Sequence, residues 1–148
     1  MFREEHIDRL KREIESRDFR VPYIGGSAIL KGIESTFVVK DNTNDRLSNW
    51  GGRIKNKHKI GTVRFAEFET ELDKLNPQEN YWLVLSDIRP TTKNLVYDCK
   101  LHVMPNLVRL HGADFFLVEK KYRWLVYFKR DESTLDIFKS GPALSPWG

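Results

Sequence analysis

The sequence has a single cysteine, Cys99, and no apolar run that approaches the length of a membrane-spanning helix. One cysteine excludes an internal disulfide, a zinc site built from paired cysteines and a thiol redox pair. A helical membrane span needs about 20 consecutive apolar residues, so no membrane association is expected. Residues 1–20 are charged throughout, where a secretory signal would carry an apolar core. We therefore expect a protein that stays in the cytoplasm.

Acidic residues are missing from one stretch of a chain that is otherwise close to balanced in charge. The net charge is only +4, from 25 basic and 21 acidic residues, and this gives no global indication of nucleic-acid binding. Residues 46–64, in contrast, contain several basic side chains and no acidic one. The basic residues of this stretch are Arg46, Arg53, Lys55, Lys57, Lys59 and Arg64.

The composition predicts one packed domain over residues 1–148, because 40% of the residues are hydrophobic and 12% are aromatic. Apolar residues at helical spacing predict an amphipathic helix at residues 2–16 and a second helix at residues 65–75. Residues 27–34 are apolar but do not distinguish a helix from a strand. Residues 36–40 are β-branched and aromatic, which favours a strand.

The C-terminal half is predicted to be an antiparallel sheet that spans residues 81–138. Its β-branched and aromatic segments, separated by turn-forming residues, predict five strands. These are residues 81–86, 94–99, 114–119, 123–129 and 134–138. A short helix is expected at residues 101–111, and residues 141–148 form a loose tail. The predicted fold class is α+β, with a mostly antiparallel sheet of about five strands and two or three packed helices.

Residues 41–62 are predicted to form a long polar loop, and such loops within compact domains often bind ligands. Tryptophan provides a stacking surface, and lysine and arginine attract phosphates or carboxylates. This basic loop is therefore a candidate contact for RNA, DNA or an acidic protein, with a solvated charge run as the alternative. The candidate binding residues are Trp50, Arg53, Lys55, Lys57 and Lys59.

Two aspartates and a lysine form the most enzyme-like pattern in the sequence. Asp87 ends one predicted strand, and Asp98 and Lys100 lie on the next. Paired carboxylates bind Mg²⁺ in metal-dependent nucleases, where a nearby lysine assists. Residues 65–100 resemble in outline the PD-(D/E)xK nuclease core, although Ser86 stands where that family commonly has proline. The resemblance implies a Mg²⁺ site, and ordinary surface charge is the alternative explanation.

The family core also has an acid on the helix before these strands. In this chain the acid would come from Glu67, Glu69 or Glu71.

The hairpin predicted at residues 114–130 is rich in aromatic side chains. Alternation along its second strand places Arg123 and Tyr127 on one side and Trp124 on the other. These three residue types are frequent in protein interfaces, so the hairpin is a candidate binding surface for a protein partner. The alternative is that helices cover one face and neighbouring side chains the other, which would make the rings part of the core.

The same hairpin carries a resemblance. Residues 115–125, FFLVEKKYRWL, with the upstream strand YWL at residues 81–83, are similar to a strand-turn-strand signature in small uncharacterised bacterial proteins. Some small α+β proteins of this kind are immunity proteins, which bind and block a cognate toxin without catalysis. A histidine-containing stretch after the second strand is replaced here by Lys129-Arg130-Asp131, so any role of those histidines is absent or altered.

We therefore expect a non-catalytic binding protein of immunity or antitoxin type that occludes a protein partner and needs no cofactor. The alternatives are a Mg²⁺-dependent nuclease that uses Asp87, Asp98 and Lys100, and a nucleic-acid-binding module that uses residues 46–64. The sequence leaves the oligomeric state open.

Overall fold

The computed structural model describes residues 9, 12, 18–20, 26–39, 47–85, 96–111 and 114–141. Several predictions lie outside this part of the chain: most of the helix at residues 2–16, the aspartate at Asp87 and most of the tail at residues 141–148. Among the helices that the structure describes, none is long and apolar enough to cross a membrane.

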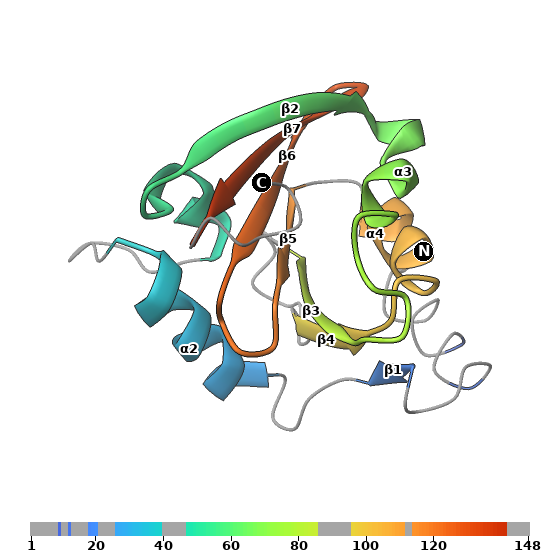
Figure 1. The fold of residues 1–148 in the computed structure, drawn as a ribbon, viewed down its shortest axis with the longest axis horizontal. Coiled ribbons are helices and arrows are strands. Elements are labelled where there is room, and N and C mark those ends of the chain that lie inside the picture. The colour runs from blue at the N-terminus through green and yellow to red at the C-terminus, as the bar shows by residue number, and fades with distance from the viewer. Residues whose placement is uncertain are drawn as a thin grey trace.

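In the part of the chain that the structure describes, seven antiparallel strands form one sheet in the order β1-β4-β3-β5-β6-β7-β2 (Figure 1). The strands are β1 (Phe19–Arg20), β2 (His58–Arg64), β3 (Tyr81–Leu85), β4 (Val96–Cys99), β5 (Phe115–Val118), β6 (Leu125–Asp131) and β7 (Thr134–Ser140). The predicted α+β character and the antiparallel sheet are confirmed, and each of the five predicted strands is present. The sheet is larger than predicted because the N-terminal half adds β1 at one edge and β2 at the other.

Helices cover both faces of the sheet (Figure 1). On one side lie α2 (Ser27–Phe37) and the 3₁₀ helix η2 (Leu47–Arg53). On the other side lie α4 (Met104–His111), the 3₁₀ helix η3 (Phe65–Glu67) and α3 (Glu69–Leu72). The helix predicted at residues 65–75 is therefore split into two short pieces, whereas the helix predicted at residues 101–111 is confirmed.

Buried side chains divide into two clusters, one on each face of the sheet. We call the side that packs against α2 and η2 the α2 face, and the side that packs against α4, η3 and α3 the α4 face. Because both faces are covered, the central strands read as nearly continuous apolar runs instead of alternating ones.

The strand predicted at residues 36–40 is wrong for residues 36 and 37, which end α2, whereas Val38 forms an isolated antiparallel bridge with Ile54 and residue 40 lies outside the described residues. Residues 27–34 are helical where the structure describes them. Ile33 and Phe37 are four residues apart, which places both side chains in the α2-face core, where they are at most 2% exposed. Thr36, which favours a strand by propensity, donates its hydroxyl to the Gly32 carbonyl at 2.8 Å. Burial of one helical face therefore outweighs the β-propensity of single residues.

The loop predicted at residues 41–62 is also wrong where the structure describes it, because residues 47–53 form η2 and residues 58–64 form β2. The register of β2 against β7 shifts between Lys59 and Gly61, which is a β-bulge. The inserted residue breaks the period-two pattern of apolar side chains. For this reason the alternation of apolar residues did not predict β2.

Candidate functional site

The aromatic rings of the hairpin are buried on both faces, which corrects the interpretation of Trp124 and Tyr127 as a binding surface. Trp124 is 6% exposed in the α4-face cluster, and Tyr127 is 4% exposed in the α2-face cluster. Arg123 is exposed, but its guanidinium is paired with the Glu119 carboxylate. The two rings are core residues and offer no surface to a partner.

Trp50 is likewise a core residue instead of an exposed stacking surface. It is 3% exposed, and its ring lies edge-on to Phe116 at 6.0 Å between centroids. The next residue has to be glycine, because the Tyr127 ring packs directly against the backbone of Gly51. A Cβ atom at this position would overlap the ring. Trp50 and Gly51 therefore dock η2 onto the sheet.

Three of the predicted cations of the basic loop hold the local structure together. Arg53, Lys55 and Lys57 each donate to a backbone carbonyl oxygen at 3.1–3.3 Å. Lys55 reaches the carbonyl of Ser35 in the last turn of α2, where the helix dipole favours a positive charge. Lys57 reaches the carbonyl of Gly51 in η2. These contacts explain part of the basic run without any ligand.

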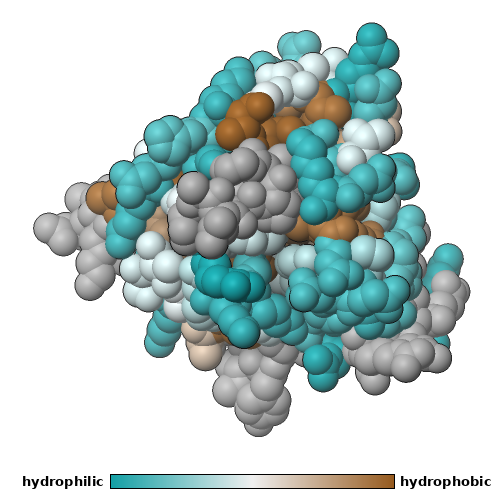
Figure 2. Space-filling view, viewed as in Figure 1, coloured by the Kyte–Doolittle hydropathy of each residue, from teal (hydrophilic) through white to brown (hydrophobic). Residues whose placement is uncertain are grey.

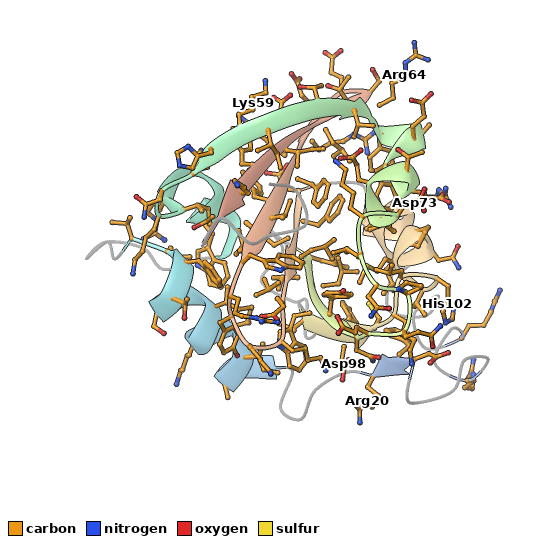
Figure 3. The ribbon with its side chains drawn as sticks, viewed as in Figure 1. Arg20, Lys59, Arg64, Asp73, Asp98 and His102 are labelled. Carbon is orange, nitrogen blue, oxygen red and sulfur yellow. The ribbon has the colours of Figure 1, made fainter. Side chains whose placement is uncertain are left out.

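Lys59 and Arg64 differ from these three cations, because they stand out from the outermost strand of the sheet (Figure 3). Their side chains are 53% and 78% exposed. Their ion pairs are long, with Lys59 3.5 Å from Asp136 and Arg64 3.9 Å from Glu67. Exposed pairs of this kind contribute little to stability, so both cations are available to a partner.

We define the basic edge as Lys59, Thr62 and Arg64 of β2. The sequence placed Lys59 among the candidate binding residues and Arg64 in the basic run at residues 46–64, but gave no indication of Thr62 or of the shared face. The signal that would have found them is the alternation of a strand, which was concealed by the bulge between Lys59 and Gly61.

Asp98 is held by three donors at the other end of the sheet. It is 4% exposed; its Oδ1 accepts from the Asn80 amide at 2.8 Å, and its Oδ2 lies 2.8 Å from both Arg20 and Lys120. Burial by itself would raise the pKa of the Asp98 carboxyl. Hydrogen bonds from Lys120, Asn80 and Arg20 outweigh burial and hold the pKa below its usual value.

Lys100 is paired away from Asp98. Its ammonium lies 3.0 Å from Asp18 Oδ1, and His102 Nε2 lies 3.0 Å from Asp18 Oδ2. Cys99, between Asp98 and Lys100, is fully buried, and burial raises the pKa of its thiol. Together with Arg20 and Asp98, these contacts fasten the short strand β1 to β4.

The parts of the nuclease hypothesis that the structure describes do not come together. Asp98 alternates with Tyr97 and Cys99, which belong to the α4-face cluster, so Asp98 projects on the α2 face. The acids at Glu67, Glu69 and Glu71 come from η3 and α3, which pack on the α4 face. Asp87 lies outside the described residues.

A nuclease of this kind would also need the basic residues 53–59 to hold the substrate phosphates close to Asp98. Four strands separate β4 from β2, which is roughly 24 Å across the sheet at about 4.8 Å per strand. Asp98 and Lys59 accordingly lie at opposite ends of the molecule (Figure 3). Within the described part of the chain, no three His, Cys, Asp or Glu side chains are grouped so that they could hold a metal ion.

Comparisons with protein-family models, with curated proteins and with solved structures find no match to this chain. The geometry of the described residues is therefore the basis for the function proposed below.

The Asp98 cluster predicts an acid-sensitive contribution to stability. Asp98→Asn is expected to lower the free energy of unfolding at pH 7 by about 1–2 kcal/mol, because a hydrogen-bonded charge is lost. The folded-state pKa lies below the unfolded one, so this contribution is present above about pH 4 and is lost as the pH falls through the folded pKa. Thermal unfolding between pH 7 and pH 2 measures the difference between the two proteins.

The matched control for this prediction is Asp73→Asn, because Asp73 is an exposed aspartate on the other side of the sheet. Its pH profile should follow that of the parent. If Asp98→Asn also follows the parent, the three donors do not stabilise the ionised carboxylate.

Proposed function

We propose that this protein is a non-catalytic binding protein of immunity or antitoxin type, which blocks an acidic protein partner in the cytoplasm by occluding it. The single observation that carries the proposal is the basic edge, an exposed pair of cations on the outermost strand of the sheet. Complementary charge steers a partner to such a surface and suppresses partners of the same sign.

The engagement of the carboxylates supports binding over catalysis. In the nuclease alternative, the Asp98 carboxylate would have to leave Asn80, Arg20 and Lys120 before it could bind Mg²⁺. The loss of these three interactions would reduce the free energy of Mg²⁺ binding, whereas the carboxylates of a dedicated metal site have no such contacts to break.

The surroundings of the basic edge favour a protein partner over a nucleic acid. Single-stranded nucleic acids bind to exposed rings as well as to cations, but Trp50 is buried, and the one large hydrophobic side chain exposed within the described residues is Val39. Asp136 and Glu67 also lie beside the cations of the edge and repel a continuous phosphate backbone. A protein with a few spaced carboxylates fits this pattern better.

The test begins with co-purification of the protein from its own cells, followed by a binding measurement with the acidic protein recovered. The double variant Lys59→Glu/Arg64→Glu is expected to weaken binding about tenfold or more, because like charges then face each other. The double variant should also lose the ability to inhibit the partner.

The matched control is Lys31→Glu/Lys121→Glu, which makes the same change in net charge at exposed positions on α2 and in the hairpin turn. Its affinity should equal that of the parent. Recovery of no protein partner would count against the proposal. Recovery of RNA or DNA, with an affinity that falls steeply as salt rises, would favour the nucleic-acid-binding alternative instead.

A further inference from the structure

The outer side of β2 is an open edge, because no other described strand pairs with it. The Phe65 N–H donates to the Ser133 carbonyl at 2.7 Å at the end of the β2–β7 ladder. Backbone groups of an antiparallel strand point alternately toward and away from the neighbouring strand. Val63 therefore faces β7, Thr62 directs its N–H and C=O groups outward, and Arg64 directs its N–H outward. The Arg64 carbonyl caps η3, where it accepts the first hydrogen bond of that helix.

A side-chain contact agrees with this assignment. Thr62 lies opposite Asp136 in the register, and its hydroxyl donates to the Asp136 carboxylate at 2.8 Å. Side chains approach closely in this way at pairs that do not exchange backbone hydrogen bonds. The N–H and C=O groups of Thr62 and the N–H group of Arg64 are thus available to another strand.

The two faces of this edge differ in chemistry. The basic edge projects on the α2 face, as shown by the contacts of Lys59 and Thr62 with Asp136. Ile60 and Val63 are partly buried and pack against the α4-face core. Hydrophobic surface emerges near the upper rim of the molecule, where β2 runs, and hydrophilic residues border it (Figure 2). A strand added here would meet cations on one face and apolar side chains on the other.

We propose that the partner contributes an extended segment as an additional strand on β2, with acidic residues alternating with apolar ones. This inference rests on the function proposed above and specifies how the partner binds. The acidic side chains lie beside Lys59 and Arg64, and the apolar ones lie beside Ile60 and Val63. Backbone hydrogen bonds to Thr62 and Arg64 supply affinity that does not depend on sequence, and the alternating side chains supply specificity.

Lys59 and Arg64 also disfavour the pairing of β2 with the β2 strand of a second copy of this chain. Pairing of β2 with β2 would crowd Lys59 and Arg64 of one copy against those of the other, and like charges on neighbouring strands are destabilising. Lysine at an edge strand protects against self-association in this way. The basic edge therefore rejects its own copy and selects an acidic strand.

The first experiment uses a synthetic peptide of alternating Val and Glu residues and measures amide hydrogen exchange of the full chain. At a free peptide concentration about ten times its Kd, exchange of the Thr62 and Arg64 amides should slow about tenfold. The Val63 amide, already bonded to β7, should change little. The same peptide with N-methylated backbone amides carries equal charge but cannot pair as a strand, and it should give no protection.

A pair of variants tests the backbone contact in the protein itself. Thr62→Pro removes an outward N–H without removing a hydrogen bond to β7, and an edge strand tolerates proline at such a position. Thr62→Val removes the hydroxyl and keeps the N–H. Binding of the peptide should be weakened about tenfold or more by proline and little by valine, at equal thermal stability.

The outcomes separate this inference from the proposed function. Equal binding of the N-methylated peptide, unchanged exchange at Thr62 and Arg64, or no binding of either peptide would overturn strand addition. Dependence of the native partner on Lys59 and Arg64 would then still support the proposed function. Protection of both amides by the peptide, with no acidic protein recovered from cells, would support strand addition and overturn the function.

Discussion

Phe128→Ala is expected to lower the free energy of unfolding by about 3–5 kcal/mol, the largest effect of any change considered for this protein. Phe128 lies in the middle of β6, is fully buried, and stacks on Phe115 with ring centroids 4.7 Å apart. Truncation removes buried apolar surface and leaves a cavity that strands on both sides prevent from closing. Urea denaturation followed by circular dichroism measures the loss.

The neighbouring Lys129→Ala is the matched control, because Lys129 is exposed on the same strand. Its effect should stay within about 0.5 kcal/mol. A loss of less than about 1 kcal/mol for Phe128→Ala would mean that the α4 face is not sealed by its helices, contrary to the burial of the hairpin.

Gly51→Ala is expected to lower the free energy of unfolding by about 2–3 kcal/mol. A methyl group at Gly51 overlaps the Tyr127 ring, and this ring cannot move aside freely. Its hydroxyl donates to the Asp114 carboxylate at 2.7 Å, and the residue is 4% exposed. Either η2 lifts away from the sheet and exposes Trp50, or the hydrogen bond of Tyr127 breaks.

Gly52→Ala supplies an unusually close control, because a Cβ atom at Gly52 has no neighbour within 4 Å. Thermal unfolding and tryptophan fluorescence of the two variants should differ clearly. If both alanine variants are as stable as the parent, the close packing between η2 and β6 does not require glycine at residue 51.

The central strands could be predicted from the sequence because apolar and β-branched residues recur between clear turns. Phe115–Val118 and Leu125–Asp131 are such runs, and both became strands of the hairpin. The same runs could not show which rings would be covered. Tyr127 is buried beneath η2 and α2, and Trp124 packs against Tyr81 on the α4 face, and the pattern within a strand does not report on these distant residues.

The candidate sites were less predictable than the fold. The spacing of Asp98 and Lys100 places both on one strand-and-turn segment, but their charge partners come from β1 and from the hairpin turn. None of these three ion pairs leaves a local signal in the sequence. Thr62 was missed for a different reason, because one inserted residue at the bulge shifts the alternation that would have placed it on the same face as Lys59 and Arg64.

The order of strands has a consequence for synthesis on the ribosome. Strands β3 to β7 are contiguous in sequence and form the middle of the sheet, whereas the N-terminal half supplies the two outer strands and the α2-face cover. The N-terminal half leaves the ribosome first, but β1 has no partner until β4 has emerged, and β2 has none until residue 140 has emerged, because β7 is the neighbour of β2. Ile33, Phe37 and Trp50 are thus exposed to chaperones during translation, and the half of the chain that is made first folds last.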